Sequence, residues 1–412
     1  MDGRTQRGRG ARALIATALV CTAAAAAGCG SSNDDDGATT AAASTSAGAT
    51  TTTATGGGGA EGNAVEIAAS VFSDRVCEPK DPAVIADIPR SVAGFTGYDS
   101  APGDWLAEPA DSPLSGKRVS WTSMGLGQPF FLAIQDHWKS FSDRYDFELK
   151  TFDGKFDASG VQKVVEDIAA DKPDAVAFAP LDSDASVPQI RRMVDAGSKV
   201  VTYNVQPREQ QVPRVFADDY LGSQIVGCNA GAYWNAKFGD RQAVIGVVDL
   251  PELPQVQDRR NGFIKGFLSQ VPTAEIGASV DGGGTLDKAA PAATDLIQGN
   301  PDVNVIFGIN NDSSLGTVQA LKAAGKYDAD WGVLASVDGS APVMRELGDP
   351  NTPYKAEGGY PPYDFAVASF NLLGADMEGR TDARSQVVLV YPPIKPDAAA
   401  IREWLDVQYP SN

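Results

Sequence analysis

The sequence has little positive charge, one histidine and few cysteines. Of its 412 residues, 53 are Asp or Glu and 34 are Lys or Arg, so the formal net charge is −19. Phosphate contacts need a basic surface, and this balance therefore argues against a nucleic-acid partner. The four cysteines contain no Cys-x-x-Cys pair and no cluster with His137, the only histidine, so we expect no zinc site.

Signatures of catalysis are also missing. No Gly-x-Ser-x-Gly elbow occurs, and the glycine-rich stretch Gly282–Thr285 lacks the lysine and serine of a P-loop, so it is interpreted as a loop. His137 lies in a helical pattern, where a surface or core position is expected. Two pairs of nearby acids follow predicted strands, as is common in turns: Asp182/Asp184 and Asp218/Asp219. The sequence thus predicts neither an enzyme nor a cofactor.

The N-terminus carries the pattern of an export signal, residues 1–28. Arginines at positions 4, 7, 9 and 12 precede an apolar stretch at 14–20, which is short for a membrane span. The exit, Ala-Ala-Gly followed by Cys29, resembles a bacterial lipobox, in which the cysteine thiol takes a diacylglyceryl group. The alternative is an ordinary signal peptide with an incidental cysteine. The interpretation we follow places the mature chain outside the cytoplasm, anchored to the cell membrane through Cys29.

The segment 29–63 has the composition of a flexible tether. It is rich in Gly, Ser, Thr, Ala and Asp and has no aromatic residue, so it cannot bury enough apolar surface to offset the entropy of ordering. Beyond it, Cys77 and Cys228 remain as the cysteines of the body. In an exported protein they either pair or stay as separate buried thiols, and the sequence does not supply the Cα distance that decides.

From residue 117 onward, short β-rich runs alternate with helical patterns. This alternation predicts parallel sheets covered by helices on both faces, and about ten strands favour two similar lobes over one open sheet. Predicted strands are 119–123, 147–152, 175–178, 199–202, 215–217, 242–248, 273–280, 303–309, 332–337 and 355–358. Predicted helices between them include 129–145, 187–196, 221–237, 255–270, 287–298, 313–324, 341–347 and 363–377.

The fold class is therefore α/β, with two doubly wound parallel-sheet lobes. We assign 117–217 plus 360–386 to lobe I and 218–359 plus 387–412 to lobe II. Residues 64–116 fit the repeat poorly and are predicted to form an N-terminal extension packed on one lobe.

Ligands of open parallel sheets bind beyond the carboxyl ends of the strands, and the residues found there are amides, carboxylates and aromatic rings. Amides and carboxylates hydrogen-bond hydroxyls, and rings cover the C–H faces of sugars, so this mixture suits a neutral, polyhydroxylated molecule. Each residue alone also has the simpler interpretation of a turn, a helix cap or core. The candidate ligand-binding residues are Gln128, Phe130, Phe131, Asn204, Asp218, Asp219, Gln257, Asn310, Asp338 and Tyr360.

Four segments also carry a family resemblance: 128–131, 179–185, 307–316 and 337–340. Through their order and spacing, the chain from Lys117 to the C-terminus resembles the ribose-binding-protein-like, type I periplasmic binding proteins of ABC transporters. The resemblance implies two lobes joined by a three-strand hinge, with crossings near Ala217, Gly359 and Gln386, which closes on a ligand.

The resemblance also assigns roles by position. Phe130 and Phe131 match the rings that sandwich a sugar, Asn310 and Asp338 match polar groups that bind hydroxyls, and Gln128 replaces an asparagine. The departures from the family pattern are Asn204-Val205 in place of Asp-Arg, Gln257 in place of an arginine, and a missing glutamine near Gly359-Tyr360. Loss of two guanidinium groups removes rigid multi-donor contacts, so another sugar, a polyol or a less hydroxylated molecule is expected rather than ribose.

The predicted function is that of a substrate-binding lipoprotein of an ABC importer, which captures a small polar solute and delivers it to a membrane permease. A lipid-anchored receptor that presents its ligand to a membrane sensor kinase would share every residue above and stays open as an alternative. A transcription factor of the lactose-repressor type shares the fold but needs a helix-turn-helix and a basic surface, and this chain has neither pattern.

Overall fold

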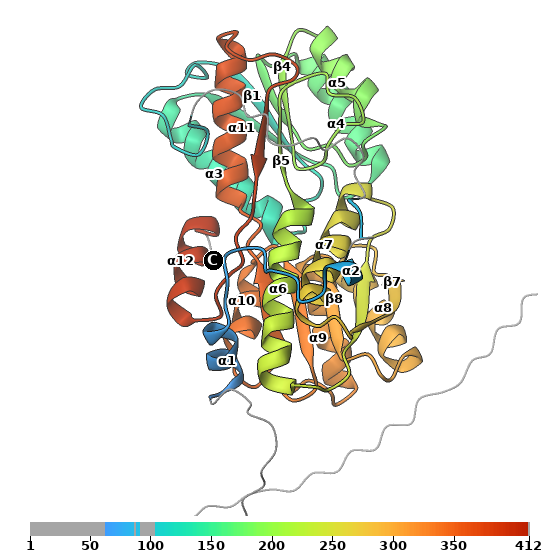
Figure 1. Ribbon diagram of the computed structural model, residues 1–412. Helices are drawn as coiled ribbons and strands as arrows, with labels where there is room; N and C mark the ends of the chain where they lie inside the picture. Colours follow the sequence, from blue (N-terminus) through green and yellow to red (C-terminus); the bar gives the residue numbers. More distant parts are fainter. Residues whose placement is uncertain (1–61, 86–87, 91–103, 411–412) are drawn as a thin grey trace, which may run out of the picture. The chain divides into compact units, whose positions relative to one another are not determined.

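Two parallel sheets form the body of the protein (Figure 1). The computed structural model describes residues 62–85, 88–90 and 104–410, all within the compact unit Gly56–Asn412. The predictions for the signal peptide 1–28, for Cys29 and for the tether up to residue 61 lie outside the described residues.

Lobe I, the upper half of the body in Figure 1, contains a six-stranded sheet with the strand order β11-β5-β4-β3-β1-β2. All of its neighbouring strands pair in parallel. Its strands are β1 (Arg118–Ser123), β2 (Glu148–Asp153), β3 (Ala175–Phe178), β4 (Lys199–Tyr203), β5 (Arg214–Ala217) and β11 (Gln386–Leu389). Its helices are α3 (Pro129–Tyr145), α4 (Ala158–Asp171), α5 (Ser186–Asp195) and α11 (Pro362–Met377).

Lobe II contains a five-stranded parallel sheet with the order β10-β9-β8-β6-β7. Its strands are β6 (Val244–Asp249), β7 (Glu275–Asp281), β8 (Val305–Gly308), β9 (Val333–Val337) and β10 (Tyr354–Gly358). Its helices are α6 (Asp219–Phe238), α7 (Pro254–Gln270), α8 (Leu286–Gly299), α9 (Asn311–Ala323) and α10 (Ala341–Gly348). The two-lobed α/β prediction is confirmed.

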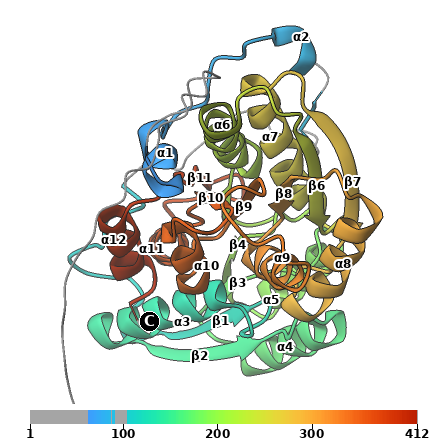
Figure 2. The same cartoon turned by 90° about the horizontal axis from the view of Figure 1, so that it is seen from below.

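Helices cover both faces of each sheet, so the inner strands bury both sets of their side chains, whereas the edge strands β2 and β7 stay partly exposed. In β3, Ala175 and Ala177 belong to the core under α3 and α11, whereas Val176 and Phe178 face α4 and α5. Adjacent residues of a strand point to opposite faces, so an uninterrupted apolar run marks a strand buried on both sides. In lobe II, α6 and α7 lie side by side on one face and α8 and α9 on the other (Figure 2).

Three crossings connect the lobes, after β5, after β10 and after β11. The amide of Asp218 donates to the carbonyl of Leu389 at 2.8 Å, and the amide of Gly359 donates to the carbonyl of Pro392 at 2.7 Å. The crossings are therefore hydrogen-bonded to one another, and they form the only described backbone links between the two sheets after residue 117.

The third crossing comes later than predicted. β11 pairs with β5 from Gln386 to Leu389, so residues 387–389 extend the sheet of lobe I instead of belonging to lobe II. This strand is only four residues long, and the sequence gives no alternation over so short a run. After it, the chain forms α12 (Ala398–Gln408), a helix that the sequence analysis did not predict.

The N-terminal extension contacts both lobes. Its first part, with α1 (Ala64–Ser70) and α2 (Pro82–Ile85), packs on α6 and α7 of lobe II, where Cys77 and Cys228 form a disulfide. Its last part lies on lobe I. The Asn371 side chain of α11 donates to the carbonyl of Trp105 at 3.0 Å. The Tyr145 hydroxyl of α3 donates to the carbonyl of Pro109 at 2.8 Å. The prediction that the extension packs on one lobe is therefore wrong.

Helices α6 and α7 approach closely because glycines lie at their contact. A Cβ atom added at Gly266 would meet the carbonyl oxygen of Gln224 at 2.0 Å, and one added at Gly227 would meet that of Phe263 at 2.1 Å. Real Cβ atoms are not found at such distances from backbone, so the helix pair depends on these glycines.

No helix in the described part of the chain is both long and apolar enough to traverse a bilayer.

We predict that Gly266→Ala lowers the free energy of unfolding by about 1–3 kcal/mol, because the added methyl group forces the two backbones apart. Gly299→Ala is the matched control, since a Cβ atom there meets nothing within 4 Å. Urea denaturation of both variants measures the effect. Equal midpoints for Gly266→Ala and Gly299→Ala would show that α6 and α7 do not need the close approach.

Candidate functional site

A cavity of about 780 Å³ lies where the carboxyl ends of the strands of both lobes meet. Its size falls within the range of small-molecule sites. Its lining includes Met124, Gln128, Phe130, Phe131, Phe156, Leu181, Asp182, Asn204, Val205, Asp219, Leu250, Glu252, Leu253, Val256, Arg259, Asp281, Thr285, Asp287, Lys288, Asn310, Asp338 and Tyr360.

Most of the candidate residues from the sequence meet in this cavity. Those in its lining are Gln128, Phe130, Phe131, Asn204, Asp219, Asn310, Asp338 and Tyr360. They come from both lobes and from the crossing after β10, so residues up to about 230 positions apart in the chain are brought together.

Asp218 and Gln257 do not line the cavity. The Asp218 carboxylate caps α6 by accepting from the Leu221 amide at 3.0 Å, and it forms an ion pair with Arg90 of the extension at 2.6 Å. The Gln257 amide donates to Asp249 Oδ1 at 3.0 Å and to the carbonyl of Leu250 at 3.1 Å. Both side chains therefore hold neighbouring segments of the protein instead of facing the cleft.

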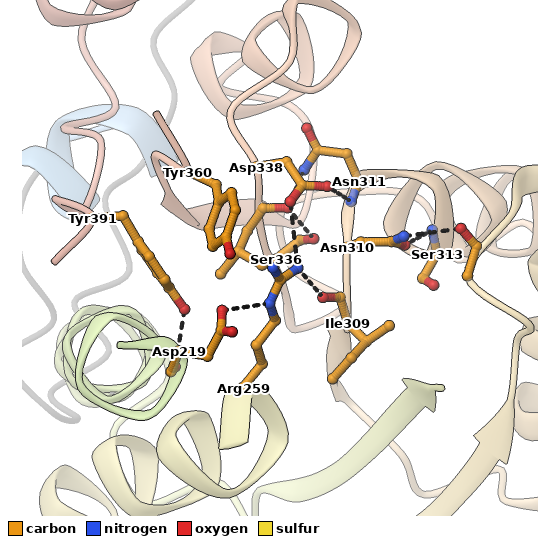
Figure 3. Close-up of polar contacts among 12 residues, drawn as sticks. Asp219, Arg259, Ile309, Asn310, Asn311, Ser313, Ser336, Asp338, Tyr360 and Tyr391 are labelled. Atoms are coloured by element: carbon orange, nitrogen blue, oxygen red, sulfur yellow. Dashed lines mark hydrogen bonds and ion pairs between the residues drawn. The ribbon is translucent and has the colours of Figure 1, made fainter. Parts of the chain in front are cut away.

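Arg259 supplies the guanidinium group that the sequence analysis took to be lost at this helix. Its Nε donates to Asp219 Oδ1 at 2.8 Å, and its Nη1 donates to the carbonyl of Ile309 at 3.2 Å and to Asp338 Oδ1 at 3.4 Å (Figure 3). The guanidinium carbon lies 4.5 Å from the centroid of the Tyr360 ring. Arg259 thus joins α6, α7 and the loops after β8 and β9 at the floor of the cavity.

A helical pattern in the sequence could have identified Arg259. On α7 the buried residues Val256, Phe263 and Phe267 share a face, and Arg259 lies on that face, three residues after the first and four before the second. A charged residue in the apolar phase of an amphipathic helix is unusual and needs a buried partner. Gln257 lies in the polar phase, half-exposed.

The carboxylates around Arg259 are held in a low-dielectric environment. Burial raises the pKa of Asp219 to about 6 and that of Asp338 to about 6, and the nearby Arg259 limits both shifts. Burial by itself lowers the pKa of Arg259, but the attraction of Asp219 and Asp338 outweighs it, so this pKa lies well above its ordinary value. At neutral pH the group is therefore a buried cation between two carboxylates.

Asp338 has a strained backbone, with φ at 126° in a region that favours glycine. Its amide donates to the carbonyl of Gly358 at 2.9 Å, its carbonyl accepts from the Tyr409 hydroxyl at 3.0 Å, and its carboxylate accepts from the Asn311 amide at 2.9 Å. These contacts fix the unfavourable conformation and direct the carboxylate toward Arg259.

A second buried network supports the loops behind the cavity. Glu357 on β10 accepts from the Asn311 side-chain amide at 2.8 Å, from the Gly339 amide at 2.7 Å and from the Tyr354 hydroxyl at 2.6 Å. Burial raises the pKa of Glu357 to about 8, although these hydrogen bonds favour the ionised form. The loops after β8 and β9, which carry Asn310 and Asp338, are thus tied to one carboxyl group.

Aromatic rings close the lobe I side of the cavity. The Phe130 ring lies edge-on to Phe131 and to Tyr360, with centroid distances of 5.0 and 5.2 Å, and Phe131 contacts Phe156 at 6.1 Å. Phe130 and Phe131 are 6% and 2% exposed, so each presents only a small part of its ring to the cavity.

Comparison with known proteins agrees with this architecture. A family model described as a periplasmic binding protein domain matches residues 119–358. The D-ribose/D-allose-binding protein of Pseudomonas aeruginosa is 26% identical over 220 residues, which cover 51% of this chain and 67% of that protein. The ribose import binding protein of Escherichia coli is 24% identical over 225 residues, which cover 54% of this chain and 73% of that protein.

A solved structure shows the same fold. The carbohydrate transporter solute-binding protein of Agrobacterium radiobacter, in complex with D-arabinose, superimposes with a TM-score of 0.63 at 14% identity. The match covers 72% of this chain and 99% of that one. These relatives are binding proteins and not enzymes, which agrees with the prediction of binding without catalysis.

We predict that Glu357→Gln flattens the pH dependence of stability. The native carboxyl keeps its proton to about pH 8, whereas the ordinary value in an unfolded chain is 4.5. The native state therefore binds more protons between these values, so the free energy of unfolding falls as the pH rises through this window. Glutamine, which stays neutral, removes this contribution.

Urea unfolding at pH 5.5, 7 and 8.5 gives the free energy of unfolding of the wild-type protein and of Glu357→Gln. The difference between the two free energies isolates residue 357, because the titration of the other groups is common to both proteins. We expect the wild-type protein to lose more stability than Glu357→Gln between pH 5.5 and 8.5. Parallel curves would contradict the raised pKa.

Proposed function

Because the chain belongs to the periplasmic binding protein family, we propose that it captures a sugar or polyol between its lobes and delivers it to an ABC permease in the membrane. The family places the body outside the cytoplasm. The convergence of amide, carboxylate, guanidinium and aromatic groups in one cavity between the lobes carries the proposal. The names of the ribose- and allose-binding relatives support the ligand class.

The charges of the lining disfavour an anionic solute. Its basic groups are Arg259 and Lys288, and Arg259 is already balanced by Asp219 and Asp338. Its carboxylates are Asp182, Asp219, Glu252, Asp281, Asp287 and Asp338. An anionic ligand such as a sugar phosphate would meet an excess of negative charge, so we expect it to be rejected.

Lobe closure is the proposed mechanism of capture. Gln128 of lobe I donates to the carbonyl of Gly284 in lobe II at 3.1 Å, and Asn310 donates to the same carbonyl at 2.9 Å. A ligand that contacts both lobes adds interactions only in the closed arrangement and so shifts the population toward it. The hydrogen-bonded crossings after β5, β10 and β11 act as the hinge.

We also propose that Cys29 is lipidated and anchors the chain to the membrane. The prediction is that Cys29→Ser moves the protein from the membrane fraction to the soluble extracytoplasmic fraction of a bacterial host that processes lipoproteins. Cys21→Ser is the matched control, since residue 21 lies within the proposed signal peptide, and it should remain in the membrane fraction. Retention of Cys29→Ser in membranes would exclude this anchor.

We predict that neutral sugars or polyols stabilise the protein whereas sugar phosphates and amino acids do not. A ligand at about one hundred times its Kd adds about 2.7 kcal/mol, which a thermal-shift screen detects as a rise of a few degrees in Tm. Isothermal titration then gives Kd, and analysis of the recovered solute tests for chemical change. Turnover of a bound solute, or binding of anions alone, would contradict the proposal.

Variants of two adjacent arginines link that binding to the cavity. Arg259→Lys keeps the charge but cannot reach Asp219, Asp338 and the Ile309 carbonyl together, so we expect affinity to fall at least tenfold. Arg260→Lys is the control, because Arg260 pairs with Asp249 outside the lining and should leave Kd unchanged.

A further inference from the structure

The two walls of the cavity differ in chemistry. Lobe I contributes six apolar residues to the lining: Met124, Phe130, Phe131, Phe156, Leu181 and Val205. Lobe II adds some apolar residues as well, but every charged side chain of the lining except Asp182 belongs to it. A bound molecule therefore meets ionised groups on one side and mainly carbon on the other.

The polar side chains of the lobe I wall already have partners within the protein. The Gln128 amide donates to the Gly284 carbonyl at 3.1 Å. Asp182 Oδ1 accepts from the Asp184 amide at 2.9 Å and from the Ala185 amide at 2.6 Å. Each of these bonds uses one polar atom of its side chain, so Oε1 of Gln128 and Oδ2 of Asp182 are the atoms on this wall that can accept from a ligand hydroxyl.

Asn204 has a structural reason to be asparagine. Its φ of 71° lies in the left-handed region, which asparagine tolerates better than most residues. Its Oδ1 accepts from the Tyr360 hydroxyl at 3.0 Å, and its Nδ2 lies 3.3 Å from the sulfur of Met124. The side chain thus connects β4 to the crossing after β10, and the next residue that reaches the cavity is Val205, which has no polar atom in its side chain.

A hydroxyl group buried against the side chains of Leu181 and Val205, which have no polar atom, would lose water without gaining a partner there, which weakens binding. A methylene or methyl group at the same place would gain apolar contact instead. The Arg259 side of the cavity, by contrast, offers carboxylates and a guanidinium group for hydroxyls.

We propose that the preferred ligand is a deoxy sugar, an inference that rests on the proposed capture of a sugar or polyol. It lies with a CH2 or CH3 edge against the lobe I wall around Val205 and with its hydroxyls toward Asp219, Arg259 and Asp338. Discrimination between a deoxy sugar and its hydroxylated counterpart is then a property of lobe I, and general affinity for sugars is a property of lobe II.

Matched sugars test this assignment by isothermal titration of the purified protein. The pairs are L-fucose with L-galactose, D-fucose with D-galactose, L-rhamnose with L-mannose, and 2-deoxy-D-ribose with D-ribose, whose members differ by one hydroxyl. We expect the deoxy member of the tightest-binding pair to bind at least tenfold more tightly than its partner. If sugars bind but the hydroxylated members bind equally or better, the deoxy assignment fails and the proposed function stands. If no sugar or polyol binds, the proposed function fails with it.

Val205→Thr places a hydroxyl on the wall with nearly the same shape. We expect it to reduce the deoxy preference at least threefold, with circular dichroism and Tm checking the fold. Val194→Thr, on the exposed side of α5, is the control and should keep the wild-type ratio. A deoxy preference that Val205→Thr leaves unchanged would overturn the placement of the deoxy edge on this wall. The Kd ratios of the matched sugars for the wild-type protein decide the ligand class by themselves, even if a variant fails to fold.

Discussion

The ion network of Arg259 holds the floor of the cleft together. Its guanidinium group is buried between Asp219 and Asp338, which come from the start of α6 and from the loop after β9. Removal of one partner from such a buried set leaves a buried charge without compensation, so loss of any one of the three side chains destabilises the other two. Because the Ile309 carbonyl joins the same group, four segments of lobe II are fixed around one cation before any ligand arrives.

The hinge is linked to this floor through Tyr391 of the third crossing. Its hydroxyl bonds with the Ser223 hydroxyl at 2.6 Å and donates to the carbonyl of Asp219 at 3.0 Å, and its ring lies 5.2 Å from that of Tyr360. Gly222 leaves room for the Tyr391 ring, since a Cβ atom there would meet it at 2.3 Å. The third crossing and the floor of the cavity are therefore connected by packed aromatic side chains.

Features that depend on local periodicity could be predicted from the sequence. The orientation of a side chain could not be predicted where its partner is distant in the chain. Buried strands and the polar residues after them follow from alternation along the chain, and Asn310 and Asp338 were found in this way. Asp218 looked equivalent to Asp219, but the ion pair with Arg90, 128 residues away, turns it out of the cavity. Gln257 lies at the entry of α7, where the family pattern predicts an arginine, but the arginine that reaches the cavity is Arg259 on the buried face of the helix. The short strand β11 exists only because β5 lies beside it.

The separation of the two walls has a consequence for how such proteins change over evolution. The residues that hold the charged floor also hold the fold of lobe II, so selection for stability constrains them. The lobe I wall around Leu181 and Val205 takes no part in that network, and its side chains can be exchanged at the cost of local packing alone. Substitutions on the lobe I wall can therefore change which molecule fits the cavity while the charged floor on lobe II stays intact.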